Sequence, residues 1–238
     1  MNEFDAAQFE ALGPWITGFE FGGVQYGGQY RAGTDPRVLG FVSTFRERLA
    51  ASNRRRDQPL RILECGCLEG GHTTVLAQAC PEAEITSTDV REASLQKAKF
   101  ILLASGVTNV RLSKENLNEP SAALSQQYDA IFCIGLLYHL RHPQSFSRAP
   151  RRRPTFYGFP PPFATNRKRL GSSATFAVAL DEAVDQPLTG VNPQSFLPTI
   201  RSLAKMFWRA GFSKISLLEK SMTPDGNGPA ELLKAEKT

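Results

Sequence analysis

Short apolar runs alternate with amphipathic stretches along residues 60–135. Four runs rich in aliphatic and β-branched residues are predicted strands, at 60–65, 85–90, 107–112 and 129–135. The helices predicted between them cover 73–79, 92–105 and 121–126. The run at 129–135 is apolar on both faces, as a central parallel strand should be. Strands that alternate with helices in this way predict a doubly wound, mostly parallel α/β sheet.

The flanking segments follow other patterns. Residues 12–33 are rich in glycine and aromatic side chains, which favours a short hairpin or an ordered arm that either packs on the sheet or covers a ligand. Asp35 and Pro36 are typical of a helix start, and that helix is predicted to end near Ala50. Towards the C-terminus the sequence predicts a helix at 195–210, then strands at 214–219 and 229–235 with an antiparallel edge.

Composition indicates one α/β domain in a cytoplasmic, soluble chain with no membrane partner. The chain has 238 residues, 41% of them hydrophobic, without an apolar run of 18 residues or a signal-like N-terminus. Its four cysteines are expected to be reduced, buried thiols. Cys65 and Cys67 with His72 lack a second ligand cluster, so no metal is predicted. The oligomeric state does not follow from the sequence.

The formal net charge of +5 comes from one segment. Residues 148–170 contain seven Lys/Arg and no Asp or Glu, and the rest of the chain has 21 basic and 23 acidic residues, a net charge of −2. Any RNA-binding hypothesis therefore depends on residues 148–170 alone.

A glycine-rich turn joins the first of the four strands to its helix. Glu64 ends the strand, Glu69 lies in the turn, and the glycines are Gly66, Gly70 and Gly71. The spacing fits neither a dinucleotide fingerprint nor a Walker loop. Two carboxylates around the turn suit a ligand with an amino group and hydroxyls; the alternative is a tight turn without a ligand.

Asp89 ends the second of these strands, 25 positions beyond Glu64. A carboxylate at this edge of a parallel sheet can accept both hydroxyls of a ribose. Because a predicted helix follows at once, Asp89 could also cap that helix. The two roles are compatible.

Three motifs together resemble the class I S-adenosylmethionine-dependent methyltransferases. They are Leu-Glu-Cys-Gly-Cys-Leu-Glu-Gly-Gly-His-Thr at 63–73, Thr-Asp-Val-Arg at 88–91 and Tyr-Asp-Ala-Ile-Phe-Cys-Ile-Gly-Leu-Leu-Tyr-His-Leu at 128–140. Over about residues 12–145 and 186–235 the chain is similar to a group of bacterial stand-alone methyltransferases. The stretch Leu-Tyr-His-Leu also resembles enzymes that carboxymethylate wobble uridine in tRNA.

The resemblance implies S-adenosylmethionine as cofactor and a role for each matching residue. Residues along the methionine and ribose side would be Glu64, Gly66, Cys67, Glu69 and Gly70. Asp89 would hold the ribose hydroxyls, with Val90 against the adenine. Asn116 stands where the family more often has Asp, and its carbonyl would accept from the adenine amine. Ile134 and Gly135 would lie beneath the sulfonium, and Tyr138 and His139 would face the acceptor.

His139 is the candidate general base. A neutral imidazole at a strand's carboxyl end could take a proton from an acceptor hydroxyl or amine during methyl transfer. The alternative is that Tyr138 and His139 only shape the pocket, because methyl transfer depends mainly on alignment.

Residues 144–179 depart from the family pattern. Five prolines between 150 and 162 disfavour a helix and cannot donate to a strand ladder, so the fifth strand is expected to be disrupted. One interpretation is a basic insertion that binds RNA or another anion. The favoured hypothesis is a stretch translated out of frame, with the family pattern resuming near Leu180. An apolar strand in another reading frame of the gene would support it.

The sequence therefore predicts a Rossmann-like α/β fold of the class I methyltransferase type. Residues 1–58 would form an arm and a helix, and 59–238 the cofactor-binding domain, with 144–179 irregular. The expected function is methyl transfer to a small-molecule or sugar-like acceptor. The alternatives are modification of a tRNA base and a catalytically inactive relative that serves as a binding protein.

Overall fold

The computed structural model describes residues 4–51, 58–141, 155–158, 177–186, 188–198, 200–222 and 229–236. The chain forms two compact units, residues 1–115 and 116–238. No helix within the described ranges is long and apolar enough to cross a membrane.

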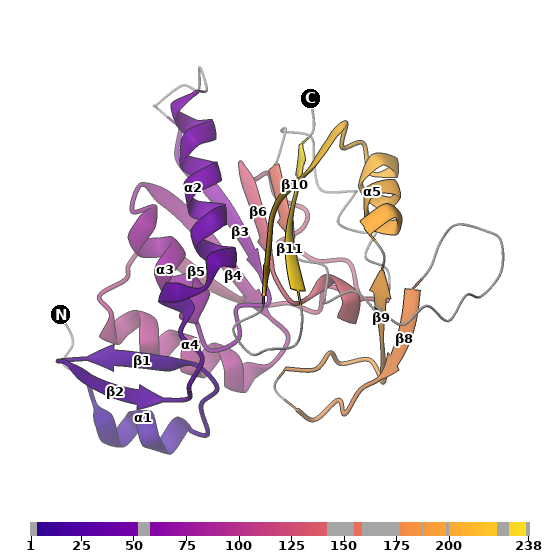
Figure 1. Ribbon diagram of the computed structural model, residues 1–238. Coiled ribbons are helices and arrows are strands. Elements are labelled where there is room, and N and C mark those ends of the chain that lie inside the picture. The colour runs from indigo at the N-terminus through magenta and orange to yellow at the C-terminus, as the bar shows by residue number, and fades with distance from the viewer. Residues whose placement is uncertain are drawn as a thin grey trace. The chain divides into compact units, whose positions relative to one another are not determined.

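The first unit contains three parallel strands connected by helices (Figure 1). In order along the chain they are β3 (Leu60–Cys65), α3 (Gly71–Ala79), β4 (Ala83–Asp89), α4 (Glu92–Ala104) and β5 (Val110–Lys114). The starts of β3 and α4 are as predicted, α3 and β4 each begin two residues earlier than predicted, and β5 begins three residues later. Cys65 pairs with Thr88, so the carboxyl ends of β3 and β4 lie side by side. Five of the six residues of β3 and five of the seven of β4 are buried, as expected of strands that are covered on both faces, whereas β5 is only partly buried.

The N-terminal arm packs on α4. It contains α1 (Ala6–Leu12) and a hairpin of β1 (Gly18–Phe21) and β2 (Val24–Gly27). Phe9 is fully buried, stacks on Trp15 at 4.2 Å and contacts Phe100 of α4. The predicted hairpin is confirmed. Helix α1 was not predicted, because one buried side chain in seven residues leaves little periodicity.

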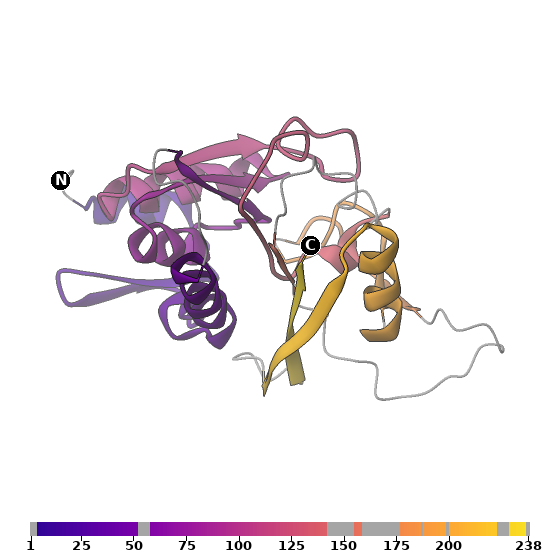
Figure 2. The same cartoon turned by 90° about the horizontal axis from the view of Figure 1, so that it is seen from above.

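Helix α2 (Pro36–Ala50) follows a single 3-10 turn, η1 (Ala32–Thr34). Asp35 caps it, accepting a hydrogen bond from the Arg37 backbone N–H at 2.8 Å. Its buried face is formed by Val38, Phe41 and Phe45, and it lies beside α3 (Figures 1 and 2). The predicted start and end of this helix are confirmed.

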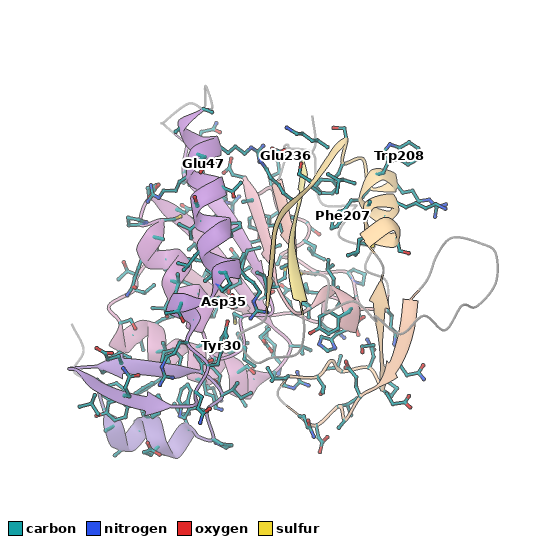
Figure 3. All side chains as sticks on the ribbon, in the orientation of Figure 1. Tyr30, Asp35, Glu47, Phe207, Trp208 and Glu236 are labelled. Atoms are coloured by element: carbon teal, nitrogen blue, oxygen red, sulfur yellow. The ribbon has the colours of Figure 1, made fainter. Side chains whose placement is uncertain are left out.

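The second unit contains parallel and antiparallel pairings. Strand β6 (Ala130–Cys133) is parallel to β7 (Thr155–Gly158), which is antiparallel to β11 (Pro229–Glu236), and β11 is antiparallel to β10 (Lys214–Met222). The predicted antiparallel edge is confirmed. Helix α5 (Ile200–Arg209) lies beside β10, with Phe207 buried and Trp208 70% exposed (Figure 3).

The expectation of a disrupted fifth strand is corrected by β7. Its four residues pair with β6 on one side and β11 on the other. They are Thr155-Phe-Tyr-Gly158, flanked by Pro154 and Pro160, so no proline has to donate within the paired stretch. Most of the remaining basic, proline-rich segment lies outside the described residues, and its origin as an insertion or a shifted frame stays a hypothesis.

Of two predicted helices, the one at 195–210 begins later than predicted, and the one at 121–126 is wrong. Residues 195–198 belong to β9 (Gln194–Pro198), which forms a two-stranded antiparallel sheet with β8 (Ala177–Asp181). Pro198 restricts the residue before it to extended backbone, so the helix begins only at Ile200. Residues 121–126 form turns instead of a short helix.

Candidate active site

The turn after β3 is fastened to the end of β4. The backbone N–H groups of Gly66 and Cys67 both donate to the Thr88 carbonyl, at 2.8 and 2.9 Å. Gly66 and Gly70 have φ of 80° and 81°, which favours glycine. A Cβ on Gly70 would also lie only 3.0 Å from the Ala98 backbone. The glycine spacing is therefore explained by the turn itself and by packing on α4.

Glu64 is buried inside the first unit. Its Oε2 accepts hydrogen bonds from Thr73 Oγ1 at 2.6 Å and Ser87 Oγ at 2.7 Å. Burial raises the pKa of this carboxyl, opposed by the two hydroxyl donors. These contacts connect β3 to α3 and β4, and the predicted cofactor contact of Glu64 stays a prediction.

Asp89 lies beside the turn, as its position at the end of β4 predicts. Its Oδ2 accepts from the Leu68 N–H at 3.0 Å, and its Oδ1 accepts from the Arg91 N–H at 2.9 Å. Burial raises the pKa of Asp89, although the backbone donors lower it in part. The carboxylate thus holds the turn and the start of α4 together, and Val90 follows it, half-buried.

Glu69 has a partner that the sequence did not indicate. Its carboxylate is 2% exposed and accepts hydrogen bonds from the backbone N–H of Thr17 at 2.7 Å and of Ile16 at 3.0 Å. Lys97 of α4 adds an ion pair at 3.0 Å. Glu69 therefore anchors the N-terminal arm to the turn. Its predicted contact with the cofactor, and the arm's predicted role as a lid, stay predictions.

A second polar cluster surrounds Asp35. The carboxylate accepts from Tyr30 Oη, lies 2.9 Å from His72 Nε2 and forms an ion pair with Arg37 at 2.7 Å; Figure 3 shows Tyr30 and Asp35 together below α2. Burial would raise the pKa of Asp35, but His72 and Arg37 hold it well below its usual range. Sequence reasoning identified only the cap. His72 belongs to this cluster, and no group of three or more metal-ligating side chains occurs among the described residues.

In the second unit, the predicted cofactor residues follow β5 and β6. Gly135 has φ of 73°, which favours glycine in the chain after β6, and Ile134 is half-buried. Asn116 Oδ1 accepts from the Asn118 N–H at 3.2 Å, and its Nδ2 donates to Glu119 at 2.9 Å. The roles of Asn116, Ile134 and Gly135 towards a cofactor stay predictions.

His139 is held by a carboxylate that sequence reasoning missed. It ends the 3-10 turn η2 (Leu137–His139), and its Nδ1 lies 2.7 Å from Oε1 and 2.9 Å from Oε2 of Glu182. The side chains of His139 and Glu182 are 7% and 8% exposed. The Tyr138 ring lies against the imidazole, with centroids 4.1 Å apart. Only a weak signal was available: Asp181 and Glu182 are the first acidic residues after Asp129.

The loop between β8 and β9 completes the surroundings of this pair. The Gly190 N–H donates to Glu182 Oε2 at 2.7 Å. Asn192 Nδ2 donates to the His139 carbonyl at 2.7 Å. A Cβ on Gly190 would lie 2.8 Å from His139 Cβ, so any larger residue would displace the pair. The imidazole and the carboxylate are therefore both fixed from the backbone side.

Comparisons with solved structures identify the fold class. The N-terminal domain of EvdMO1 with SAH (S-adenosylhomocysteine) bound has a TM-score of 0.76 and 25% identity, covering 98% of this chain and 94% of that one. The same domain in the presence of SAH and D-fucose gives the same TM-score at 24% identity. Magnesium protoporphyrin IX methyltransferase of Synechocystis PCC 6803 with bound SAM reaches 0.54 at 16% identity, over 87% and 80% of the two chains. The fold is that of the Rossmann-like methyltransferases.

Comparison of the sequence with known families and proteins finds similarity over part of the chain. Residues 56–153 match the family model described as a methyltransferase domain. A stretch of 89 residues is 35% identical to the ubiquinone biosynthesis O-methyltransferase of Salmonella enteritidis PT4, over 37% of this chain and 36% of that protein. A Synechococcus protein, syc1184_c, is 38% identical over 84 residues, 20% of its length. The chain thus spans about a third or less of the length of these curated relatives, and the part that matches a methyltransferase domain is residues 56–153.

Proposed function

We propose that this protein transfers a methyl group from S-adenosylmethionine to a hydroxyl of a small, sugar-like acceptor. The observation that carries the proposal is the turn of the methyltransferase domain, hydrogen-bonded to the Asp89 carboxylate at the end of β4. An O-methyltransferase of ubiquinone biosynthesis among the relatives and a structural neighbour determined with D-fucose support a small hydroxyl acceptor.

The residues around the turn suit the cofactor's ribose. An ionised carboxylate has about four lone-pair positions, and backbone N–H groups occupy one on each oxygen of Asp89. The remaining positions can accept two hydroxyl donors. The donors from Leu68 and Arg91 also fix the direction of the carboxylate before a ligand arrives, which lowers the entropic cost of binding.

The cofactor supplies a methyl group on a sulfonium, whose sulfur leaves with the electron pair of the broken C–S bond as a neutral thioether. The acceptor oxygen forms the new C–O bond and must lose its proton. In our proposal His139 accepts that proton at Nε2 and later releases it to water. Tyr138 shapes the acceptor side, while Ile134, Gly135 and Asn116 contact the cofactor.

Calorimetric titration of S-adenosylhomocysteine into the purified protein tests cofactor binding. We expect Asp89→Ala to weaken it on the order of 100-fold, because a hydrogen bond to a charged group contributes about 1.5–3 kcal/mol. Glu92→Gln is the matched control, since Glu92 is exposed at the start of α4. Circular dichroism checks that each variant is folded. Absence of binding to the wild type would contradict the proposal, and unchanged affinity in Asp89→Ala would remove the ribose role.

Transfer of a radiolabelled methyl group to D-fucose, other monosaccharides and tRNA then separates the acceptor classes. We expect label in a sugar and none in tRNA. Label in tRNA alone would favour the base-modification alternative. Cofactor binding without transfer to any acceptor in the panel would favour a catalytically inactive binding protein.

A further inference from the structure

We propose that Glu182 is a positioning residue for His139, so that the two side chains work as a carboxylate–imidazole pair in methyl transfer. The inference rests on the proposed function and adds a residue to it from the loop between β8 and β9. Glu182 follows β8, and its backbone N–H donates to the Pro193 carbonyl at 2.9 Å, closing that loop.

The geometry selects one form of the imidazole. Both Glu182 oxygens lie within 2.9 Å of His139 Nδ1, and an ionised carboxylate can only accept. Nδ1 therefore carries the hydrogen, which leaves the lone pair of the neutral ring on Nε2. Without Glu182, the ring could rotate or adopt the other tautomer, with Nε2 protonated and unable to act as a base.

The carboxylate also stabilises the product of proton transfer. When Nε2 takes the acceptor's proton, the ring becomes an imidazolium 2.7 Å from a carboxylate oxygen. Both side chains are more than nine-tenths buried, so water screens their attraction only weakly. The new charge is thus stabilised by a partner already in place, without reorganisation of solvent.

The surrounding backbone holds the carboxylate in this position. The Gly190 N–H bonds Oε2, and the Asn192 amide bonds the His139 carbonyl. Asn192 also lies 3.4 Å from Asn118 Oδ1, which accepts from the Arg141 N–H at 2.8 Å. If Glu182 only balanced the charge of a protonated His139, neither the Gly190 hydrogen bond to its carboxylate nor the Asn192 hydrogen bond to the His139 backbone would be required.

Steady-state kinetics with the sugar methylated by the wild type, D-fucose being the first probe, test the role. A positioned base contributes about 10²–10⁴-fold. We expect Glu182→Gln to lower kcat on the order of 10- to 100-fold with KM changed by less than about twofold. Glu182→Asp should recover part of the loss because it keeps the charge. Asp185→Asn is the control, an exposed acid in the same loop.

Binding of S-adenosylhomocysteine to Glu182→Gln should equal that of the wild type, which separates positioning from a general loss of structure. A fully active Glu182→Gln variant would overturn the positioning role and leave the proposed function intact. A wild type that binds no S-adenosylhomocysteine and methylates nothing would end both.

Nitrogen NMR of the imidazoles gives a second readout on the unmodified protein. The chain has three histidines, so His139 can be assigned by comparison with His139→Gln. We expect the neutral ring to carry its hydrogen on Nδ1 in the wild type. A ring protonated on Nε2 would overturn the inference even if Glu182→Gln failed to fold.

Discussion

At the residue scale, the Asp35 carboxylate joins the start of α2 to Tyr30 and to His72 of α3. Its carboxylate caps α2 through the Arg37 N–H and also meets Tyr30, His72 and the Arg37 side chain. It is fully buried, so removing the charge would leave its cationic partner without compensation. Asp35 therefore stabilises the first unit well beyond its role as a cap.

Replacement of Asp35 should reveal this in the pH dependence of stability. The pKa of Asp35 is lowered on folding, so its contribution is present above the unfolded pKa of about 3.9 and is lost as the pH falls below it. We expect Asp35→Asn to reduce the free energy of unfolding by about 3 kcal/mol at pH 7. In urea titrations the gap to the wild type should narrow near pH 3.

Asp5→Asn is the control for this experiment, since Asp5 caps α1 at the surface. A gap that stays constant between pH 7 and pH 3 would show that the ionised carboxylate of Asp35 is not the source of the stability.

The position of a site residue could be predicted from the sequence where the pattern of strands and helices around it was regular. Asp89 could be placed beside the turn because the carboxyl ends of neighbouring parallel strands meet. The partners of Glu69 and His139 could not, because they lie 52 and 43 positions away along the chain. No periodicity relates such residues; only the folded topology brings them together.

At the scale of elements, the arm is attached through Glu69. Two N–H groups of the arm and the Lys97 ammonium share one buried carboxylate in the turn. The arm also packs closely there, because a Cβ on Gly71 would lie 2.8 Å from Thr17 Cγ2. The arm and the turn should therefore open together.

Hydrogen exchange tests this attachment. We expect Glu69→Gln to speed exchange of the Ile16 and Thr17 amides by roughly tenfold or more, because hydrogen bonds to a charged group contribute about 1.5–3 kcal/mol. Glu10→Gln, an exposed change within α1, should leave these amides unaffected. Equal exchange in Glu69→Gln and the wild type would place the arm's attachment in its aromatic packing instead.

Elements were predicted best where the hydrophobic period was unambiguous. The β3–α3–β4–α4–β5 series differs from expectation by a few residues at its ends. The β8–β9 sheet was missed because Phe196, Ile200, Leu203 and Phe207 also fit a helical spacing. Strand β7 was missed because four proline-free residues are too short to show a period.

At the scale of the whole molecule, the excess of positive charge is concentrated in residues 148–170. The seven basic residues of 148–170 all lie outside β7, so they can be replaced without altering that strand. The RNA-binding hypothesis predicts that this replacement abolishes tRNA binding, and the small-molecule proposal predicts that it leaves methylation of the acceptor unchanged.

We expect a variant with all seven basic residues changed to glutamine to methylate its small acceptor at the wild-type rate. Any binding of tRNA in a gel shift should be lost, because counterion release at phosphates drives such binding. A matched variant with seven exposed basic residues elsewhere changed to glutamine controls for net charge. Loss of methylation only in the first variant would show that the segment takes part in acceptor recognition.

The close packing at Gly190 makes the substitutions allowed at positions 139, 182 and 190 depend on one another. It has room for no side chain, since even the methyl group of alanine would meet both His139 and Glu182. A substitution at 190 is therefore tolerated only in a background where the imidazole or the carboxylate has already become smaller. Mutations at these sites should be strongly epistatic, so homologues would exchange the three residues as a set and not one at a time.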